Sequence, residues 1–181
     1  KDVQALLRTA DEHGYRTQLM AAVESVNEVQ KRKLFDLIQG HFRGQLAGRV
    51  FALWGLAFKP NTDDIRCAPS ITLIRQLLEA GASVRAFDPQ ATVEMIALIP
   101  AASGIHYCQS QSEALDGADA LVLITEWKAF WNPDFAYLRA KLRETVVFDG
   151  RNVYDPDEVE RAGLAYYGIG RGRSVRRGEE Q

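Results

Sequence analysis

Two helical patterns of apolar residues open the chain. Apolar side chains recur at helical spacing over residues 3–10 and again over the longer stretch 19–38. His13 and Gly14 supply a stop for the first helix, and the glycines of residues 40–44 end the second. Two helices cannot bury an apolar face of that length between themselves. We therefore expect them to pack on the domain that follows, on a preceding domain or on a second subunit.

After Gly48 the pattern changes to short apolar runs that alternate with helical segments, which is typical of an α/β domain with a mainly parallel sheet. The predicted strands are 50–56, 83–87, 105–108, 120–125, 145–149 and 164–169. The predicted helices are 68–80, 92–98, 112–115, 136–142 and 157–162. The sequence therefore predicts a doubly wound, Rossmann-like sheet preceded by a helical pair with one long helix.

These patterns divide the chain into three parts. Residues 1–47 form a partial helical segment suited to dimerisation, and residues 48–170 form the α/β domain. Residues 171–181 combine glycine with charge and contain one large aliphatic side chain, so we expect a mobile tail. Because the chain starts at Lys1 and Asp2, inside a helical pattern, we expect it to be part of a longer polypeptide.

Composition narrows the classes of partner. With 46% hydrophobic and 25% charged residues and a formal net charge of -2, the chain is an ordinary globular protein without an electrostatic reason to bind nucleic acid. No apolar run approaches the roughly 20 residues that span a bilayer, so we expect no membrane partner. Cys67 and Cys108 lack the spacing of a metal site or a disulfide framework. We accordingly expect a cytoplasmic protein that binds no metal.

Ligands of open α/β sheets bind beyond the carboxyl ends of the strands, where loops and helix amino termini converge. This rule selects the loop 55–70, the Asp-Pro pair 88–89, and residues 125–127 and 149–152. The loop 55–70 lacks a Gly-x-Gly-x-x-Gly sequence, so we do not expect a complete NAD-binding fold there.

That loop instead carries Lys59 and Arg66 before a helix that starts near Pro69, where free backbone amides favour an anion. An exposed loop whose cations pair with Asp63 and Asp64 at the surface explains the same residues equally well. Composition does not separate the two interpretations.

The other polar positions of this edge have structural interpretations at least as good as functional ones. Asp88 is more often a strand-ending turn residue than a ligand contact. Arg151 is placed to pair with Asp149 or Asp155.

Several further residues are interpreted as structural. We expect Trp127 and Trp131 to complete a core rather than stack on a base, and Cys67 to be a small packed residue rather than a thiol of low pKa. The basic residues 31–33 are expected to be solvated near a helix end. The three histidines have no paired acid in the sequence, so solvated or structural roles are favoured.

A close resemblance to the UDP-glucose/GDP-mannose dehydrogenase family is carried by residues 55–66, which read Gly-Leu-Ala-Phe-Lys-Pro-Asn-Thr-Asp-Asp-Ile-Arg, and by Ala-Pro-Ser at 68–70. Phe-Asp-Pro at 87–89, Thr-Glu-Trp at 125–127 and Asp-Gly-Arg-Asn at 149–152 follow in the order of the family. The resemblance implies that an amino-terminal Rossmann domain holds NAD, a long central helix builds a homodimer and a carboxyl-terminal domain holds the sugar nucleotide. This chain resembles the last two parts.

The resemblance also assigns site residues. Lys1 and Asp2 match the end of a Cys-Phe-Pro-Lys-Asp motif, whose nucleophilic Cys would stand just before this chain. Asp2 then matches a catalytic carboxylate that assists proton transfer and water activation, and Lys1 a residue near the cofactor. The remaining matches are Phe58, Lys59 and Arg151 to contacts of the sugar nucleotide, and Arg66 to a residue that reaches NAD across the cleft.

By the same resemblance, the intact enzyme oxidises the C6 alcohol of UDP-glucose to the uronate in two NAD-dependent steps, through a Cys thiohemiacetal and a thioester, for use in polysaccharide biosynthesis. This chain alone is expected to bind the UDP-sugar without turnover. A fragment of a GDP-mannose or UDP-N-acetyl-sugar 6-dehydrogenase remains open, because those enzymes share the framework. A stand-alone nucleotide-binding module and a purely structural dimerisation domain also remain open.

Overall fold

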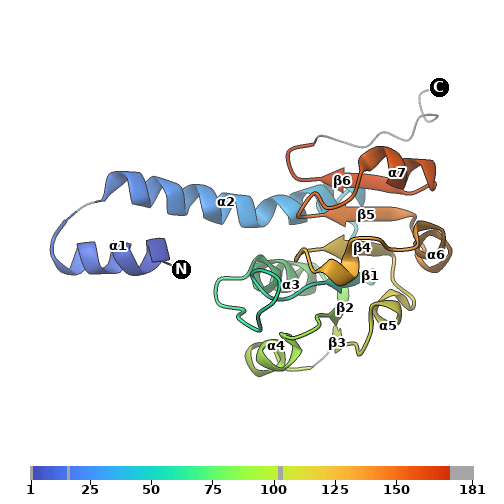
Figure 1. Ribbon diagram of the computed structural model, residues 1–181, viewed down its shortest axis with the longest axis horizontal. Helices are drawn as coiled ribbons and strands as arrows, with labels where there is room; N and C mark the ends of the chain where they lie inside the picture. Colours follow the sequence, from blue (N-terminus) through green and yellow to red (C-terminus); the bar gives the residue numbers. More distant parts are fainter. Residues whose placement is uncertain (1, 16, 102–103, 172–181) are drawn as a thin grey trace.

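The computed structural model describes residues 2–15, 17–101 and 104–171. Both amino-terminal helices are present, α1 (Asp2–Glu12) and α2 (Gln18–His41), as the apolar spacing predicts. Figure 1 shows the amino-terminal half of α2 extending beyond the sheet, with α1 folded back beside it.

A six-stranded parallel sheet follows, in the order β3-β2-β1-β4-β5-β6. Its strands are β1 (Val50–Trp54), β2 (Ser83–Phe87), β3 (Ile105–Tyr107), β4 (Ala120–Leu123), β5 (Val146–Asp149) and β6 (Ala165–Gly168). Every predicted strand is confirmed, although several end one or two residues earlier than expected. The order reverses between β1 and β4, which is the switch point of a doubly wound sheet.

Helices cover both faces of this sheet. They are α3 (Pro69–Glu79), α4 (Thr92–Leu98), α5 (Gln111–Leu115), α6 (Phe135–Lys141) and α7 (Pro156–Arg161). Figure 1 shows α2, α3 and α4 on one face and α5, α6 and α7 on the other. A short 3-10 helix, η1 (Lys128–Phe130), was not predicted.

The core lies between the sheet and these helices. The four residues of β4 and of β5 are all buried, as the apolar runs 120–123 and 146–148 indicate for strands covered on both faces. From α3, the apolar face buries Leu73, Ile74 and Leu77. The helix then stops before Gly81, whose φ of 77° is a left-handed conformation that glycine adopts without a steric penalty.

The carboxyl-terminal half of α2 is anchored to this domain. Leu34 and Ile38 are buried in the common core, and His41 Nδ1 lies 2.9 Å from the hydroxyl of Tyr167 in β6. The following domain is thus one of the packing partners expected for the helical pair. The exposed large apolar residues of the other half are Leu19, Val23, Val26 and Val29.

The two ends of the chain are described only in part. Of the expected tail 171–181, only Arg171 lies among the described residues, and its Nη1 donates to the carbonyl of Tyr154 at 3.3 Å. Lys1 lies outside the described residues. Among the described helices, none combines the length and the apolar character that crossing a membrane requires.

Candidate functional site

A groove of about 550 Å³ lies between the middle of α2 and the carboxyl ends of the strands. The loop between β1 and α3, the start of α3 and the segments after β4, β5 and β6 contribute to its wall. Lining side chains include Lys31, Leu34, Phe58, Arg66, Ile124 and Arg151. This position next to the β1/β4 switch point is where doubly wound folds bind ligands.

Asp88 fixes the base of the β1–α3 loop. The carboxyl group is buried, with only 4% of the residue exposed. Its oxygens accept hydrogen bonds from the backbone N–H groups of Leu56, Ala57, Gln90 and Ala91 and from the indole N–H of Trp127. The interpretation of Asp88 as a strand-ending turn residue is confirmed. Through these hydrogen bonds, the same carboxylate connects the ends of β1 and β2 to Trp127, the residue before η1.

Two hydroxyl groups hold the same loop from its other sides. Ser70 Oγ donates to the carbonyl of Leu56, and Thr125 Oγ1 donates to that of Ala57, both at 2.6 Å. Gly55 has a φ of 96°, and a Cβ at this position would lie 2.5 Å from the Cβ of Thr125. The Gly-Leu-Ala start of the loop is therefore set by close packing against the end of β4.

The turn after β5 is held by Asp149, which is fully buried. Its carboxylate accepts from the backbone N–H of Arg151 at 2.9 Å and from the N–H of Tyr154 and the hydroxyl of Tyr166, both at 3.0 Å. Burial raises the pKa of both tyrosines above the usual value, and the charge of Asp149 raises it further. Asp149 thereby positions Arg151 by accepting a hydrogen bond from the backbone N–H of that residue.

Arg151 reaches from this turn across the end of β4 to the β1–α3 loop. Its Nε donates to the carbonyl of Ile124 at 2.7 Å, and its Nη2 to that of Phe58 at 2.8 Å. Its Nε also lies 2.9 Å from a carboxylate oxygen of Glu126. The expected side-chain pairing with Asp149 or Asp155 is wrong, because Asp149 accepts from the backbone and from tyrosine instead.

Phe58, Lys59 and Arg66 lie on the outer part of the loop. The N–H of Phe58 donates to the carbonyl of Asp64 at 3.0 Å, and Lys59 Nζ lies 5.1 Å from the centre of the Phe58 ring. The guanidinium of Arg66 makes two hydrogen bonds to Asp64, of 2.8 and 2.6 Å, which raise its pKa. Surface pairing is thus confirmed for Arg66, which also lines the groove with 66% of its side chain exposed.

Two features of the groove were missed by sequence reasoning. Lys31 was expected to be solvated, but it lines the groove and pairs with Glu28 at 2.5 Å. The signal was its position three residues before Leu34, on the helix face that packs inward. The other feature is Gly150, where a Cβ would lie 2.9 Å from the carbonyl oxygen of Leu123 and 3.0 Å from Leu34.

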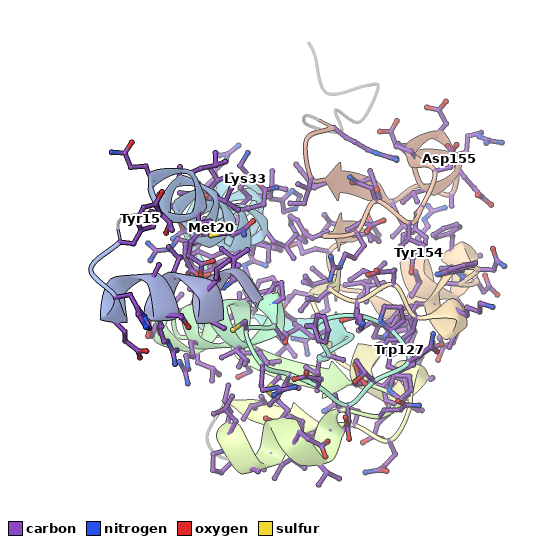
Figure 2. The ribbon with its side chains drawn as sticks, turned by 60° about the vertical axis from the view of Figure 1, so that its left-hand side comes forward. Tyr15, Met20, Lys33, Trp127, Tyr154 and Asp155 are labelled. Atoms are coloured by element: carbon purple, nitrogen blue, oxygen red, sulfur yellow. The ribbon has the colours of Figure 1, made fainter. Side chains whose placement is uncertain are left out.

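The aromatic and cysteine interpretations are partly corrected. Trp127 is buried, as expected for a core residue, and Figure 2 shows it with Tyr154 away from the long helix. Trp131 is 48% exposed and donates its indole N–H to the carbonyl of Glu126, so its assignment to the core is wrong. Cys67 is not packed either, because the loop turns there with a φ of 61° and leaves it exposed on the groove.

The structure brings together Phe58, Arg66 and Arg151 in one groove, whereas Lys59 lies beside it on the ring of Phe58. Asp2 begins α1, but its side chain is not among those described. The catalytic assignment of Asp2 and the cofactor assignment of Lys1 therefore stay predictions.

Comparison with known proteins identifies the family. The model of the UDP-glucose/GDP-mannose dehydrogenase family, UDP binding domain, matches residues 52–156, which is more than half of the chain. The chain belongs to this family. Among curated members, the UDP-glucose 6-dehydrogenase of Pseudomonas aeruginosa is 47% identical over 177 residues, covering 96% of this chain and 39% of that relative.

Solved structures of dehydrogenases share the fold. A UDP-glucose dehydrogenase from Pyrobaculum islandicum matches with a TM-score of 0.75 at 32% identity, over 93% of this chain and 36% of that one. The NDP-N-acetyl-D-galactosaminuronic acid dehydrogenase of Methanosarcina mazei matches with a TM-score of 0.77 at 24% identity, over 99% and 38% of the two chains, and this likeness shows the fold alone. The present family member spans less than two fifths of the length of these proteins.

Proposed function

We propose that this chain is the sugar-nucleotide-binding part of a UDP-glucose 6-dehydrogenase and that the groove holds the UDP group. The observation that carries the proposal is the convergence of Phe58, Arg66 and Arg151 on one groove at the switch point of the sheet. The match to a UDP-binding domain supports the nucleotide, and the name of the Pseudomonas relative supports UDP-glucose as the substrate.

The chemistry of the groove suits a nucleoside diphosphate. Phe58, Ile124 and Ile169 supply apolar surface for the base, and Lys31, Arg66 and Arg151 supply cationic donors for phosphate oxygens. A guanidinium has five N–H donors, so Arg151 can hold the two carbonyls that it bonds and still donate to a ligand. We assign Lys59 a contact with the substrate beside the ring of Phe58.

In the whole protein, the proposed reaction is the two-step oxidation of UDP-glucose to UDP-glucuronate with NAD. Asp2 would assist proton transfer, and Lys1 and Arg66 would contact the cofactor. The turn after β1 does not itself fit a dinucleotide, because Ala57 and Pro60 stand where a Gly-x-Gly-x-x-Gly turn that begins at Gly55 has its second and third glycines. We therefore assign the binding of NAD mainly to another part of the protein.

We also propose that α2 forms a homodimer. Leu19, Val23 and Val26 share one face of the half of α2 that extends beyond the sheet, and all three are exposed. Leu34 and Leu37, further along the same helix, pack against the core of their own chain. The interface is therefore assigned to the amino-terminal half of the helix, with a second copy of this chain as its partner.

The binding proposal is tested by calorimetric titration of the chain with UDP, UDP-glucose and GDP-mannose. We expect binding of the uridine ligands, weakened by about tenfold or more in Arg151→Lys, because lysine keeps the charge but loses the planar fork. Lys59→Ala should also weaken binding, whereas Lys128→Ala, exposed in η1, is the control that should not.

Each other outcome of this titration is informative. Preference for GDP-mannose would contradict the proposed substrate, and failure of every ligand to bind would contradict the proposed site. Production of NADH from UDP-glucose by this chain alone would contradict the assignment of NAD to another part of the protein.

A further inference from the structure

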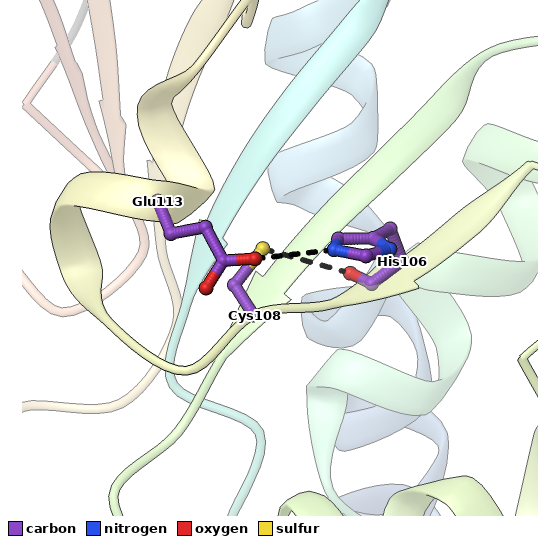
Figure 3. Close-up of side chains that lie close together, drawn as sticks. All are labelled: His106, Cys108 and Glu113. Carbon is purple, nitrogen blue, oxygen red and sulfur yellow. Dashed lines mark hydrogen bonds and ion pairs between the residues drawn. The ribbon is translucent and has the colours of Figure 1, made fainter.

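Three potential metal ligands lie together at the β3 edge of the sheet, outside the groove. His106 belongs to the edge strand β3, Cys108 follows it, and Glu113 lies in the first turn of α5. One ligand atom from each residue lies within 4.8 Å of the other two, and His106 Nε2 lies 3.2 Å from a carboxylate oxygen of Glu113. Figure 3 shows the imidazole, the thiol and the carboxylate turned toward one another.

The backbone explains this arrangement. Residues two apart in an extended segment project to the same side, which places His106 and Cys108 together. Ser110 caps α5 by accepting from the N–H of Glu113 at 3.1 Å, so the chain turns back toward the end of the strand. The second carboxylate oxygen of Glu113 accepts from the N–H of Gln109 at 2.7 Å, which fixes the side chain over this turn.

We propose that His106, Cys108 and Glu113 bind a zinc ion. Imidazole nitrogen, thiolate sulfur and carboxylate oxygen are the three kinds of ligand that zinc takes from proteins, with water in the fourth position of a three-residue site. Zinc bonds of about 2.0–2.3 Å in a tetrahedron place ligand atoms about 3.5 Å apart. The present separations of up to 4.8 Å close to that value by small rotations of His106 and Glu113, whose side chains are 58% and 35% exposed.

Local charges set the strength of the site. The thiolate and the carboxylate together neutralise a divalent ion, and hydrogen bonds from Gln109 and then His106 lower the pKa of Glu113 and keep it ionised. Burial raises the pKa of Cys108 to about 11, so the ion has to displace a proton from the thiol. The guanidinium of Arg85, which donates to the carbonyl of Glu113, also opposes a cation. Displacement of the thiol proton and repulsion from Arg85 both lower the affinity, so we expect weaker binding of zinc than in a zinc finger.

The ion would join the edge strand to α5. An edge strand has one unpaired side, and a metal clip at its end restrains it against opening. Because the ligands lie on the folded strand and helix, zinc is expected to bind the native state more strongly than the unfolded chain and to raise the midpoint of thermal unfolding.

The test uses the reduced, metal-free 181-residue chain and Co²⁺, whose visible bands report tetrahedral geometry and whose near-ultraviolet charge-transfer band reports a thiolate ligand. We expect one Co²⁺ per chain with both features, and displacement of Co²⁺ by Zn²⁺. His106→Ala and Glu113→Gln should weaken the binding by about tenfold or more, and Cys108→Ser should remove the charge-transfer band. Cys67→Ser and His13→Ala change the same residue types elsewhere and should leave the spectrum unchanged.

Thermal unfolding with and without Zn²⁺ gives a second result that does not depend on the spectrum. His106 is exposed, so His106→Ala is expected to fold, and the rise that Zn²⁺ produces in the unmodified chain should be smaller in it. The proposal is overturned if the chain gives no thiolate band with Co²⁺, if the band persists in Cys108→Ser, or if Zn²⁺ raises the midpoint equally in His106→Ala. Neither result depends on the binding of UDP in the groove.

Discussion

Single buried carboxylates set the shape of the groove without lining it. Asp88 accepts hydrogen bonds from backbone N–H groups that follow β1 and β2, and Asp149 holds the turn that carries Arg151. A buried charge is stable only when hydrogen bonds replace its hydration, and both residues meet that condition. We therefore expect the two positions to determine stability more strongly than the exposed charges of the loops.

Asp88→Asn should lower the free energy of unfolding by about 2–3 kcal/mol, because an amide replaces one acceptor oxygen by a group that cannot accept from these N–H groups. Urea unfolding measures the change. Asp63→Asn, on the exposed part of the loop, is the matched control and should leave the midpoint in place. Equal midpoints for the two variants would contradict the role given to Asp88.

Replacement of two glycines by alanine should change the free energy of unfolding in opposite directions. Gly150→Ala adds a Cβ 2.9 Å from the carbonyl oxygen of Leu123, so we expect a loss of about 1–3 kcal/mol in the free energy of unfolding. Gly40→Ala meets nothing within 4 Å and lies in α2, so we expect a gain of up to about 1 kcal/mol. Chemical denaturation compares them, and a neutral Gly150→Ala would refute the close approach of Gly150 to the end of β4 and to Leu34 of α2.

The site residues could be predicted from sequence to different extents. Phe58, Arg66 and Arg151 line the groove, and they lie in the segments 55–70 and 149–152 that the strand-end rule selects, because the topology of a parallel sheet brings those loops together. The ion pair of Arg151 with Glu126 was not found, because it joins two separate loops and depends on how the turn after β5 directs the side chain. Sequence spacing carries no information about such a contact.

At the scale of elements, the long helix has two differently packed halves. Leu34 is buried against the α/β domain, whereas Val26, two turns earlier, is 64% exposed. The periodicity of apolar residues predicted the whole helix but not which half packs on the same chain. The reason is that apolar spacing is the same for a face buried against a domain and for one buried against a second subunit.

Substitutions in the two halves should separate folding from association. Leu34→Ala is expected to cost about 2–5 kcal/mol of stability through the cavity it leaves, while the dimer mass is retained. Val26→Glu is expected to reduce the dimer mass with little change in the stability of the monomer. Light scattering and urea unfolding measure the two quantities, and an unchanged mass for Val26→Glu would count against the proposed interface.

Short elements, and clusters built from two elements, are harder to predict from the sequence than strands are. Alternation of short strand-like runs and helical segments predicted all six strands: β4 has a continuous apolar sequence, whereas β2 and β3 alternate buried and more exposed residues. The 3-10 helix η1 was not predicted, because its three residues are too few to show a periodic pattern. The cluster of His106, Cys108 and Glu113 was not predicted, because its residues follow the spacing His-x-Cys-x-x-x-x-Glu and come from the end of a strand and from a helix.

Over the whole molecule, buried tyrosines make stability sensitive to alkaline pH. Burial raises the pKa of Tyr107 to about 12, and that of Tyr154 and Tyr166 still further, from an unfolded value of 10.0. Below pH 10 these phenols are protonated in both states, so their contribution to stability is fully present. Above it the unfolded chain loses protons first, and stability falls as the pH rises toward the folded values.

Urea midpoints measured between about pH 8 and pH 11 check this sign. Tyr166→Phe should make the alkaline decline less steep, because it removes one phenol whose pKa is raised beside Asp149. Tyr15→Phe, at a position that is 69% exposed, should not change the slope. A midpoint that stays constant up to pH 11 would show that these phenols do not ionise on unfolding as expected.

The proposed function depends on the binding of UDP in the groove between α2 and the carboxyl ends of the strands. Amide chemical shifts of the isotopically labelled chain during titration with UDP test it most directly. We expect changes at residues 55–70, 124–126 and 149–152 and along the middle of α2, with the β3 edge and α7 unchanged. Changes centred on the β3 edge, or no changes at saturating UDP, would contradict it.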